Sequence, residues 1–177
     1  MQELSRKVLF EPLGMRKSRF RCHSFVMNAR DMGRFGLMIL AKGNWNGQPI
    51  MKDQAFLDAM LDSSQQLNQS YGYLWWLNGK ESFRTVGQQR QALPGPLVPD
   101  APKDMVCANG KGGQRIYVVP SLGLVVVRLG DNPVDVLATL RNLNSDGTQS
   151  KFDNQLWGKL MLALPKSGET KKGITKR

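Results

Sequence analysis

The chain has 177 residues, 41% hydrophobic and 22% charged, and no run of about 18 apolar residues, so its composition excludes a disordered, fibrous or membrane-spanning protein. The formal charge is +11, but more than half of the excess lies at the ends: residues 1–22 carry six basic and two acidic side chains, and residues 166–177 carry five and one. No aromatic-basic platform or helix-turn-helix pattern accompanies this charge, so we expect solvated basic ends and no specific nucleic-acid partner, with non-specific retention on polyanions as the alternative.

The N-terminal stretch is predicted to be the end of a helix. Residues 3–10 are apolar and basic, and Pro12 and Gly14 would stop a helix there. Residues 1–7 have no long apolar segment behind their charges, so no signal peptide is visible.

The clearest helix is predicted over residues 28–42. Asn28 is a good N-cap, and Asp31 suits the first turn as a reciprocal capping residue and as a negative charge near the helix start. Gly43 ends the pattern. The apolar face follows one-sided helical spacing and consists of Met32, Phe35, Gly36, Ile39 and Leu40.

The middle of the chain is predicted to contain a helix, a strand and a long loop. A short helix is expected over residues 52–61, and the aromatic run over 71–78 predicts a strand. Residues 79–103 contain four prolines and can only be a loop. A loop of that length usually covers something, so it is the best internal candidate for the rim of a cleft.

A hairpin and a final helix are predicted near the C-terminus. The β-branched runs 114–119 and 124–129, joined by turn residues 120–123, favour an antiparallel pair. The second run is continuously apolar, so both of its faces should be covered. A helix over 152–164 has one apolar side, and the tail 166–177 is expected to be disordered.

Five segments carry motifs that occur together in one order. Residues 10–15 read F-E-P-L-G-M, and residues 28–36 begin N-A-R-D. Residues 71–76 read Y-G-Y-L-W-W, residues 110–120 contain G-K-G-G-Q followed by I-Y-V-V-P, and residues 153–157 read D-N-Q-L-W. Each is weak alone, but together they resemble β-lactamase-related serine hydrolases, the superfamily of penicillin-binding proteins and class C β-lactamases. The resemblance runs from about Glu3 to Leu164, with Asn28 where the family has Thr.

This resemblance implies a mixed α/β fold in which an antiparallel sheet is flanked by helices, with an all-helical insertion. Residues 1–165 would be the C-terminal part of a β-lactamase or transpeptidase-like domain, with sheet strands near 71–78, 113–119 and 124–129. The first strands and the helix that carries the nucleophile would come from a preceding part. The family also implies a bacterial, periplasmic or otherwise extracytoplasmic protein.

The chain itself lacks the motif that would supply a nucleophile. By resemblance, the catalytic serine belongs to a Ser-x-x-Lys turn followed by Tyr-x-Asn, both before the P-L-G-M element. No serine here stands three residues before a lysine. Ser18 reaches Arg21 at that spacing, but a guanidinium stays protonated and cannot act as the base.

One substrate-binding element does carry over by resemblance. Lys111, Gly112 and Gly113 stand in the place of the family's Lys/His-x-Gly motif, on the strand that lines the cleft. Two glycines let a substrate approach the backbone, and an ammonium beside them favours an anionic group such as a carboxylate. The resemblance makes the backbone N–H of Gln114 one of two oxyanion donors, the other belonging to the absent serine. The alternative is a Gly-rich turn with a solvated lysine.

Other candidate residues have weaker support. By resemblance, His23 and Ser24 would lie near the rim of the cleft. His23 is the single histidine, so a multi-histidine metal site is not expected, and neither is a cofactor. Cys22 and Cys107 are expected to be free thiols rather than a disulfide. The tryptophan pair in 71–78 is expected to be core rather than a ligand platform.

Three functions follow in order of support. In the first, the chain is part of a serine hydrolase that acts on an ester, amide or β-lactam through an acyl-serine intermediate. Its substrate would be a small acyl compound, and the chain would be inactive without its other half. In the second, it is a truncated protein that only binds. The third is a basic protein that binds polyanions. The sequence does not show which of these substrates the protein would use, because the loops around the pocket determine substrate choice.

Overall fold

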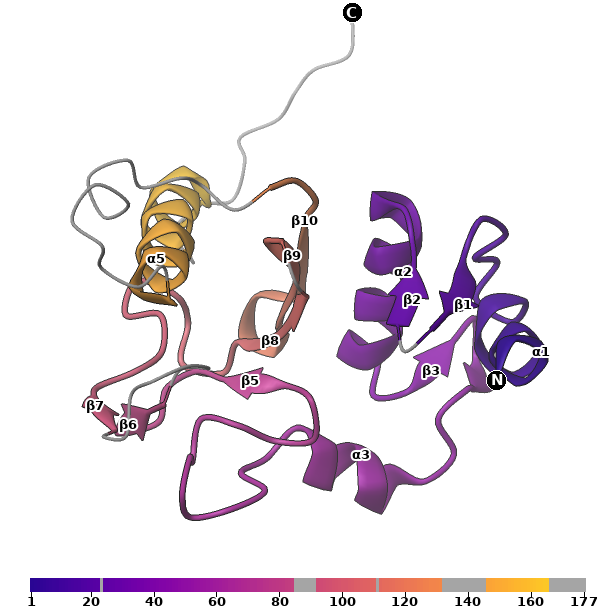
Figure 1. Ribbon diagram of the computed structural model, residues 1–177, viewed down its shortest axis with the longest axis horizontal. Coiled ribbons are helices and arrows are strands. Elements are labelled where there is room, and N and C mark those ends of the chain that lie inside the picture. Colours follow the sequence, from indigo (N-terminus) through magenta and orange to yellow (C-terminus); the bar gives the residue numbers. More distant parts are fainter. Residues whose placement is uncertain (23, 85–91, 111, 132–145, 166–177) are drawn as a thin grey trace, which may run out of the picture.

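The computed structural model describes residues 1–22, 24–84, 92–110, 112–131 and 146–165 (Figure 1). Its helical elements are α1 (Gln2–Ser5), the π-helical continuation η1 (Arg6–Phe10), α2 (Ala29–Leu40), α3 (Gln54–Met60), the 3-10 turn η2 (Pro120–Leu122) and α5 (Asp146–Ala163). Three small antiparallel pairs are β1 (Arg19–Arg21) with β2 (Ser24–Val26), β3 (Asn44–Trp45) with β4 (Gln48–Pro49), and β6 (Ser82–Phe83) with β7 (Leu93–Pro94). None of the helices in the described part of the chain is long and apolar enough to cross a membrane.

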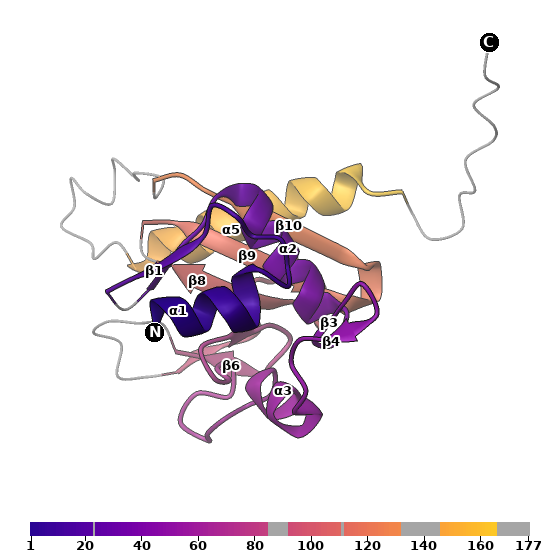
Figure 2. The ribbon, with the colours of Figure 1, turned by 90° about the vertical axis from the view of Figure 1, so that its right-hand side faces the viewer.

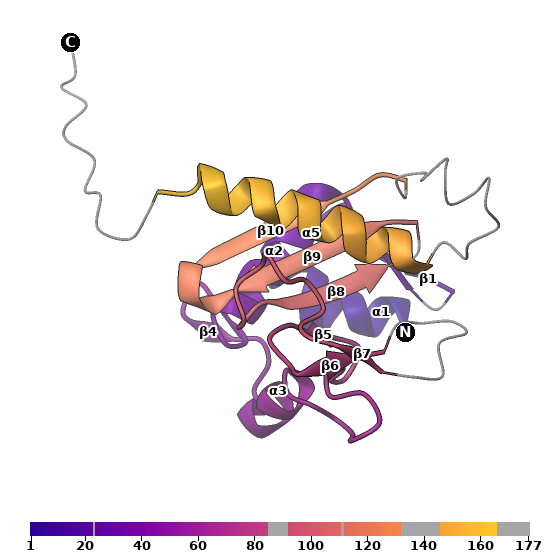
Figure 3. The same ribbon diagram turned by 90° about the vertical axis from the view of Figure 1, so that its left-hand side faces the viewer.

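The centre of the molecule is a four-stranded antiparallel sheet with the order β10-β9-β8-β5. Its strands are β5 (Trp76–Leu77), β8 (Val106–Gly110), β9 (Gln114–Val119) and β10 (Leu124–Arg128). Helix α2 and the N-terminal elements lie on one face (Figure 2), and α5 crosses the other (Figure 3). The expected mixed α/β fold, with helices flanking an antiparallel sheet, is therefore confirmed.

Helix α2 begins and ends where its sequence predicts. The side chain of Asn28 accepts a hydrogen bond from the backbone N–H of Asp31, and Gly43 follows the helix with a φ of +82°. Gly36 allows α2 to lie close to the sheet, because a Cβ there would be 2.6 Å from Cγ1 of Val125 and 2.9 Å from Cγ2 of Ile116.

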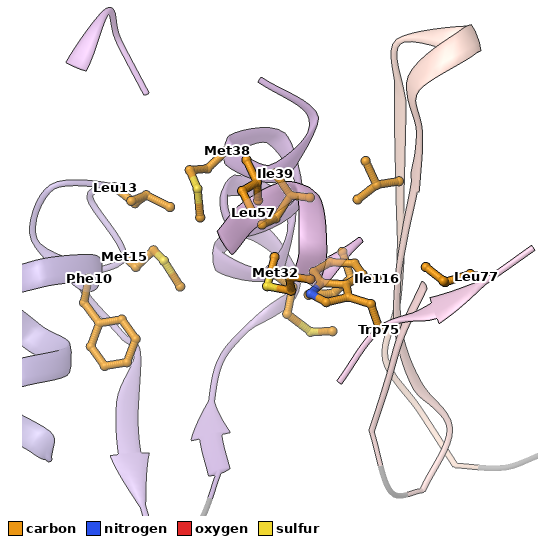
Figure 4. Close-up of a cluster of buried hydrophobic side chains, with 12 residues drawn as sticks. Phe10, Leu13, Met15, Met32, Met38, Ile39, Leu57, Trp75, Leu77 and Ile116 are labelled. Carbon is orange, nitrogen blue, oxygen red and sulfur yellow. The ribbon is translucent and has the colours of Figure 1, made fainter. Parts of the chain in front are cut away.

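The larger hydrophobic cluster surrounds α2. Figure 4 shows Met38 of this helix near Leu13 and Met15 of the N-terminal segment, while Met32 and Ile116 meet beside Trp75 on the side of the sheet. The helix is thus enclosed between residues 10–15 and the sheet. This arrangement explains why its apolar positions extend around more than one face.

Alternation along β9 divides the core into two clusters. Ile116 and Val118 belong to the cluster around α2, whereas Tyr117 and Val119 belong to the cluster beneath α5. Trp157 of α5 is completely buried there, and its ring meets that of Tyr117 edge to face at 5.6 Å. Strand β10 contributes alternate residues to both clusters, which confirms that both of its faces are covered.

The predicted strand over 71–78 is wrong for most of its length. Only Trp76–Leu77 pairs with β8, and Tyr71 bridges to Trp76 within the segment. The chain turns at Leu74, whose φ is +64°, and Gly72 lies so close to the carbonyl of Met60 that a Cβ would be 2.3 Å from that oxygen. Local turn geometry therefore overrides the strand propensity of the aromatic residues.

The region between the predicted strands also differs from its prediction in two places. Strand β8 was not predicted, although it is the inner strand between β5 and β9. The segment 79–103 is not entirely a loop, because β6 and β7 form a short antiparallel pair within it. Its C-terminal part is held by Asn78, whose side chain donates to the carbonyls of Val98 and Pro102 at 3.0 Å each.

Candidate functional site

A pocket of about 580 Å³ lies where the β1–β2 hairpin, the start of α2 and the β8–β9 turn meet. Its wall is mostly apolar, and its polar side chains are Ser24, Asn109 and Gln114. The remaining lining residues are Phe25, Val26, Met27, Met32, Phe35, Leu74, Ala108, Gly110, Ile116 and Leu129.

The hairpin wall is positioned by a buried carboxylate. Asp31 is only 2% exposed, and its side chain accepts hydrogen bonds from the hydroxyl of Ser18 and from the guanidinium of Arg34, each at 2.9 Å. The same guanidinium nitrogen donates to the carbonyl of Gly14 at 2.8 Å. Asp31 therefore connects α2 to the segment that leads into β1, a contact that its prediction as a capping residue did not include.

Aromatic contacts support the same hairpin from the other side. The ring of Phe25 meets those of Phe10 and Phe20 edge to face, with centroids 5.3 and 5.8 Å apart. Phe10 is buried in the main cluster, whereas Phe25 is 40% exposed. The hairpin is therefore attached to the core through one ring while it borders the pocket.

The ends of β8 and β9 that flank their connecting turn form the opposite wall. Gly110 pairs with Gln114 at its base, and Gly112 and Gly113 have φ values of +74° and +85°, a region that L side chains rarely adopt. The side-chain amide of Gln114 donates to the carbonyls of Gly112 and Gly130, each at 3.2 Å. The turn is thereby connected to the segment that follows β10.

Arg128 strengthens the outer side of this turn. Its guanidinium donates to the carbonyls of Gly113 and Asp131 and lies 4.7 Å from the ring centroid of Phe152 on α5. The turn is consequently held by side chains from β9 and β10 and is connected through Phe152 to α5.

The structure brings together some of the predicted site residues. Gln114 and Ser24, 90 positions apart in the sequence, line the same pocket. Gly112 and Gly113 form the adjacent turn without lining the pocket. Lys111 and His23 lie outside the described residues, so their predicted roles stay predictions.

The predicted rim over 79–103 can be compared with this pocket over residues 79–84 and 92–103, the part that the structure describes. None of the residues of that segment that the structure describes lines it. Asp100 instead exchanges two hydrogen bonds of 2.8 Å with Asn154 of α5, on the other side of the sheet. Sequence reasoning also missed the pocket role of Phe35, because helical spacing marks apolar residues as core without showing which of them border a cavity.

The described side chains offer no activated nucleophile. Among the serines that the structure describes, the hydroxyl hydrogen bonds run to backbone carbonyls or carboxylates, as at Ser18 and Ser121, and none to a lysine amine. Both cysteines are free, as expected. Burial, with the nearby charge of Asp153, raises the pKa of the Cys107 thiol well above its usual range, which keeps it protonated. In the described ranges, His, Cys, Asp and Glu form no group of three that could hold a metal ion.

Comparison with known proteins identifies the fold. No family model and no curated protein sequence matches the chain. Among solved structures, a candidate beta-lactamase from Bacteroides dorei DSM 17855 aligns with a TM-score of 0.50 and 15% identity, over 76% of this chain and 45% of that one. A candidate 6-aminohexanoate-dimer hydrolase from Bacillus anthracis aligns with a TM-score of 0.53 and 17% identity, over 86% and 38%.

The chain has a β-lactamase-like fold. The resemblance carried by the five sequence segments is thus confirmed at the level of the fold. The chain spans less than half the length of each matched structure. At this level of identity the likeness to these two structures concerns the fold alone.

Proposed function

We propose that this chain is part of a serine hydrolase that cleaves an ester, amide or β-lactam through an acyl-serine intermediate, and that it is inactive alone. The observation that carries the proposal is the meeting of Gln114 and Ser24 at one pocket in a β-lactamase-like fold. The motif resemblance assigns both residues to the cleft, and they come from distant parts of the sequence.

The chain would contribute substrate binding and half of an oxyanion hole. The backbone N–H of Gln114 would donate to the oxygen that becomes negative when the acyl carbon is attacked. The ammonium of Lys111 would favour an anionic substrate group, and Gly112 and Gly113 would let the substrate approach the backbone. These assignments come from the resemblance and from the place of Gln114 in the pocket.

The nucleophile would come from a part of the fold outside these residues. We propose that residues 1–165 form the C-terminal part of the domain and that 166–177 form a basic tail. Two observations support this division: the chain spans less than half of each matched structure, and β10 has β9 as its one partner among the described strands.

A covalent probe tests the proposal directly. The purified chain should not be labelled by a fluorophosphonate or a fluorescent penicillin, because the sequence has no Ser-x-x-Lys and no serine hydroxyl that the structure describes bonds to a lysine amine. Covalent labelling of these 177 residues alone would contradict the proposal. The reading frame upstream of Met1 should encode Ser-x-x-Lys and Tyr-x-Asn; a frame without them would favour the alternative of a truncated protein that only binds.

The role of Gln114 can be tested in the complemented protein. When the upstream polypeptide is supplied, Gln114→Pro should slow its acylation about 100-fold, because proline removes the backbone N–H. Gln114→Ala is the matched control, since it keeps the N–H and should preserve most of the rate. The melting temperatures of both variants show whether Gln114→Pro has unfolded the turn. Equal rates in two folded variants would refute the oxyanion assignment.

A further inference from the structure

Two consecutive residues of α5 contact arginines on the strands β9 and β10. The carboxylate of Asp153 lies 3.5 Å from Nε of Arg115. The ring centroid of Phe152 lies 4.7 Å from the guanidinium carbon of Arg128. The sheet register pairs Arg115 directly with Arg128, and paired residues of an antiparallel ladder project from the same face with Cβ atoms about 5 Å apart. The two side chains therefore start side by side on the face that α5 crosses (Figure 3).

Both arginines also bind the backbone where β8 turns into β9. Nη1 of Arg115 donates to the carbonyl of Gln114 at 2.8 Å and to that of Gly110 at 3.2 Å. Gly110 and Gln114 are the pair that closes the turn, so this guanidinium holds both of its ends. Nη1 of Arg128 donates to the carbonyl of Gly113. The carbonyls on both sides of the Gln114 N–H are thus accepted by the two arginines.

Arg128 holds the peptide unit that carries the proposed oxyanion donor. The carbonyl of Gly113 and the N–H of Gln114 belong to one planar trans peptide unit, in which they point in opposite directions. A hydrogen bond that fixes this carbonyl therefore fixes the direction of the N–H. Gly113 has a φ of +85°, and glycine restrains the backbone less than any other residue. The arginine supplies a restraint that the local sequence does not.

The link from α5 to Arg115 is buried. Arg115 and Asp153 are both nearly inaccessible to solvent, and the other carboxylate oxygen of Asp153 accepts a hydrogen bond from the hydroxyl of Tyr117 at 2.7 Å. Charges that are shielded from water interact more strongly than charges at the surface. Removal of the carboxylate charge should therefore reach the guanidinium and the carbonyls that it binds.

We propose that Asp153 and Phe152 are positioning residues, which act through Arg115 and Arg128 to aim the Gln114 N–H at the reacting oxygen. Neither of them lines the pocket. The inference rests on the proposed function, because it needs Gln114 as an oxyanion donor. It assigns a part in the rate of the reaction to α5, which lies on the opposite side of the sheet from α2.

The kinetics of covalent labelling test this role in the complemented protein. With the upstream polypeptide supplied, Asp153→Asn should lower the maximal rate of fluorophosphonate labelling about tenfold, less than the loss of an oxyanion donor, because the N–H remains but is aimed less well. The half-saturating probe concentration should stay nearly unchanged, since the pocket wall is intact. Phe152→Leu should act in the same direction through Arg128 while leaving the buried ion pair in place.

Asn154→Ala is the matched control. This residue is next to Asp153 on α5 and exchanges two hydrogen bonds with Asp100, so its loss weakens the attachment of the helix without touching either arginine. It should leave the labelling rate unchanged. Melting temperatures show which variants are folded, and Phe152→Leu carries the test if Asp153→Asn is not. An equal loss of rate in Asn154→Ala, or no loss in either of the other two variants, would overturn the proposal.

A spectroscopic measurement separates this proposal from the proposed function. The amide NMR signals of Gly113 and Gln114, recorded without probe, should shift or broaden in Asp153→Asn and Phe152→Leu but not in Asn154→Ala. A complemented protein that the fluorophosphonate does not label would reject the hydrolase, whereas the amide signals would still show whether α5 restrains the turn. Labelling with unchanged amide signals in all three variants would keep the hydrolase and reject the positioning role.

Discussion

Asp153 connects α5 to the sheet through two buried partners. Its carboxylate accepts a hydrogen bond from the hydroxyl of Tyr117 at 2.7 Å and lies 3.5 Å from Nε of Arg115. All three residues are nearly inaccessible to solvent. The guanidinium of Arg115 also donates to the carbonyls of Gly110 and Gln114, at the base of the pocket turn. One carboxylate thus couples α5 to the wall of the candidate site.

Asp153→Ala should reduce the free energy of unfolding by about 3–5 kcal/mol, because it removes the carboxylate that faces the buried guanidinium of Arg115. Tyr117→Phe is the milder comparison and should cost about 1 kcal/mol, since it removes one hydrogen bond to the carboxylate. Urea denaturation of the two variants, each complemented with the upstream polypeptide, measures both values. A loss for Asp153→Ala no larger than that for Tyr117→Phe would show that the ion pair does not stabilise the fold.

The contact between α2 and the sheet depends on one glycine. Gly36→Ala should destabilise the protein by about 1–3 kcal/mol, because the added methyl group would overlap Val125 and Ile116 in the core. Gly33 lies on the same helix with nothing within 4 Å of an added Cβ. Gly33→Ala is therefore the matched control and should stabilise the helix by about 0.5–1 kcal/mol. Melting curves of the two variants, each complemented with the upstream polypeptide, should move in opposite directions.

Elements determined by local chemistry could be predicted from the sequence. Helix α2 has its cap, its apolar spacing and its terminal glycine within 16 residues, and β9 and β10 are β-branched runs joined by a turn. Strand β8 could not be found in this way, because Val106–Gly110 ends in Ala, Asn and Gly, residues of low strand propensity. It becomes a strand because it pairs with β5 on one side and β9 on the other.

Only some of the residues that line the candidate pocket could be assigned from the sequence. Motif order assigned Gln114 and Ser24 to one cleft, and the pocket contains both. Met27 and Leu74 could not be assigned, because their place in the wall depends on how the hairpin and the turn after Gly72 fold over the sheet. The side-chain role of Gln114 as a bridge to Gly130 likewise depends on contacts 16 residues apart.

At the scale of the whole molecule, the sheet ends in an apolar strand. All five residues of β10 are half-buried, although four of them are Leu or Val. Among the described strands β10 pairs with β9 alone, so one edge carries backbone N–H and C=O groups without a strand partner. Such an edge favours association with other chains. The matched structures, each more than twice as long as the aligned part, are large enough to cover an edge of this kind.

We therefore expect the isolated chain to be poorly soluble or to lack a cooperative thermal transition, because an apolar strand edge and exposed side chains such as Leu37 would remain uncovered. Near-ultraviolet circular dichroism during heating, with sedimentation at several concentrations, measures both properties. Deletion of residues 166–177 is the control and should change neither, since the proposed cause lies in β10. A sharp, concentration-independent melt of a purified monomer would show that these residues form a complete domain, and the proposal that the rest of the fold is supplied from outside would then be wrong.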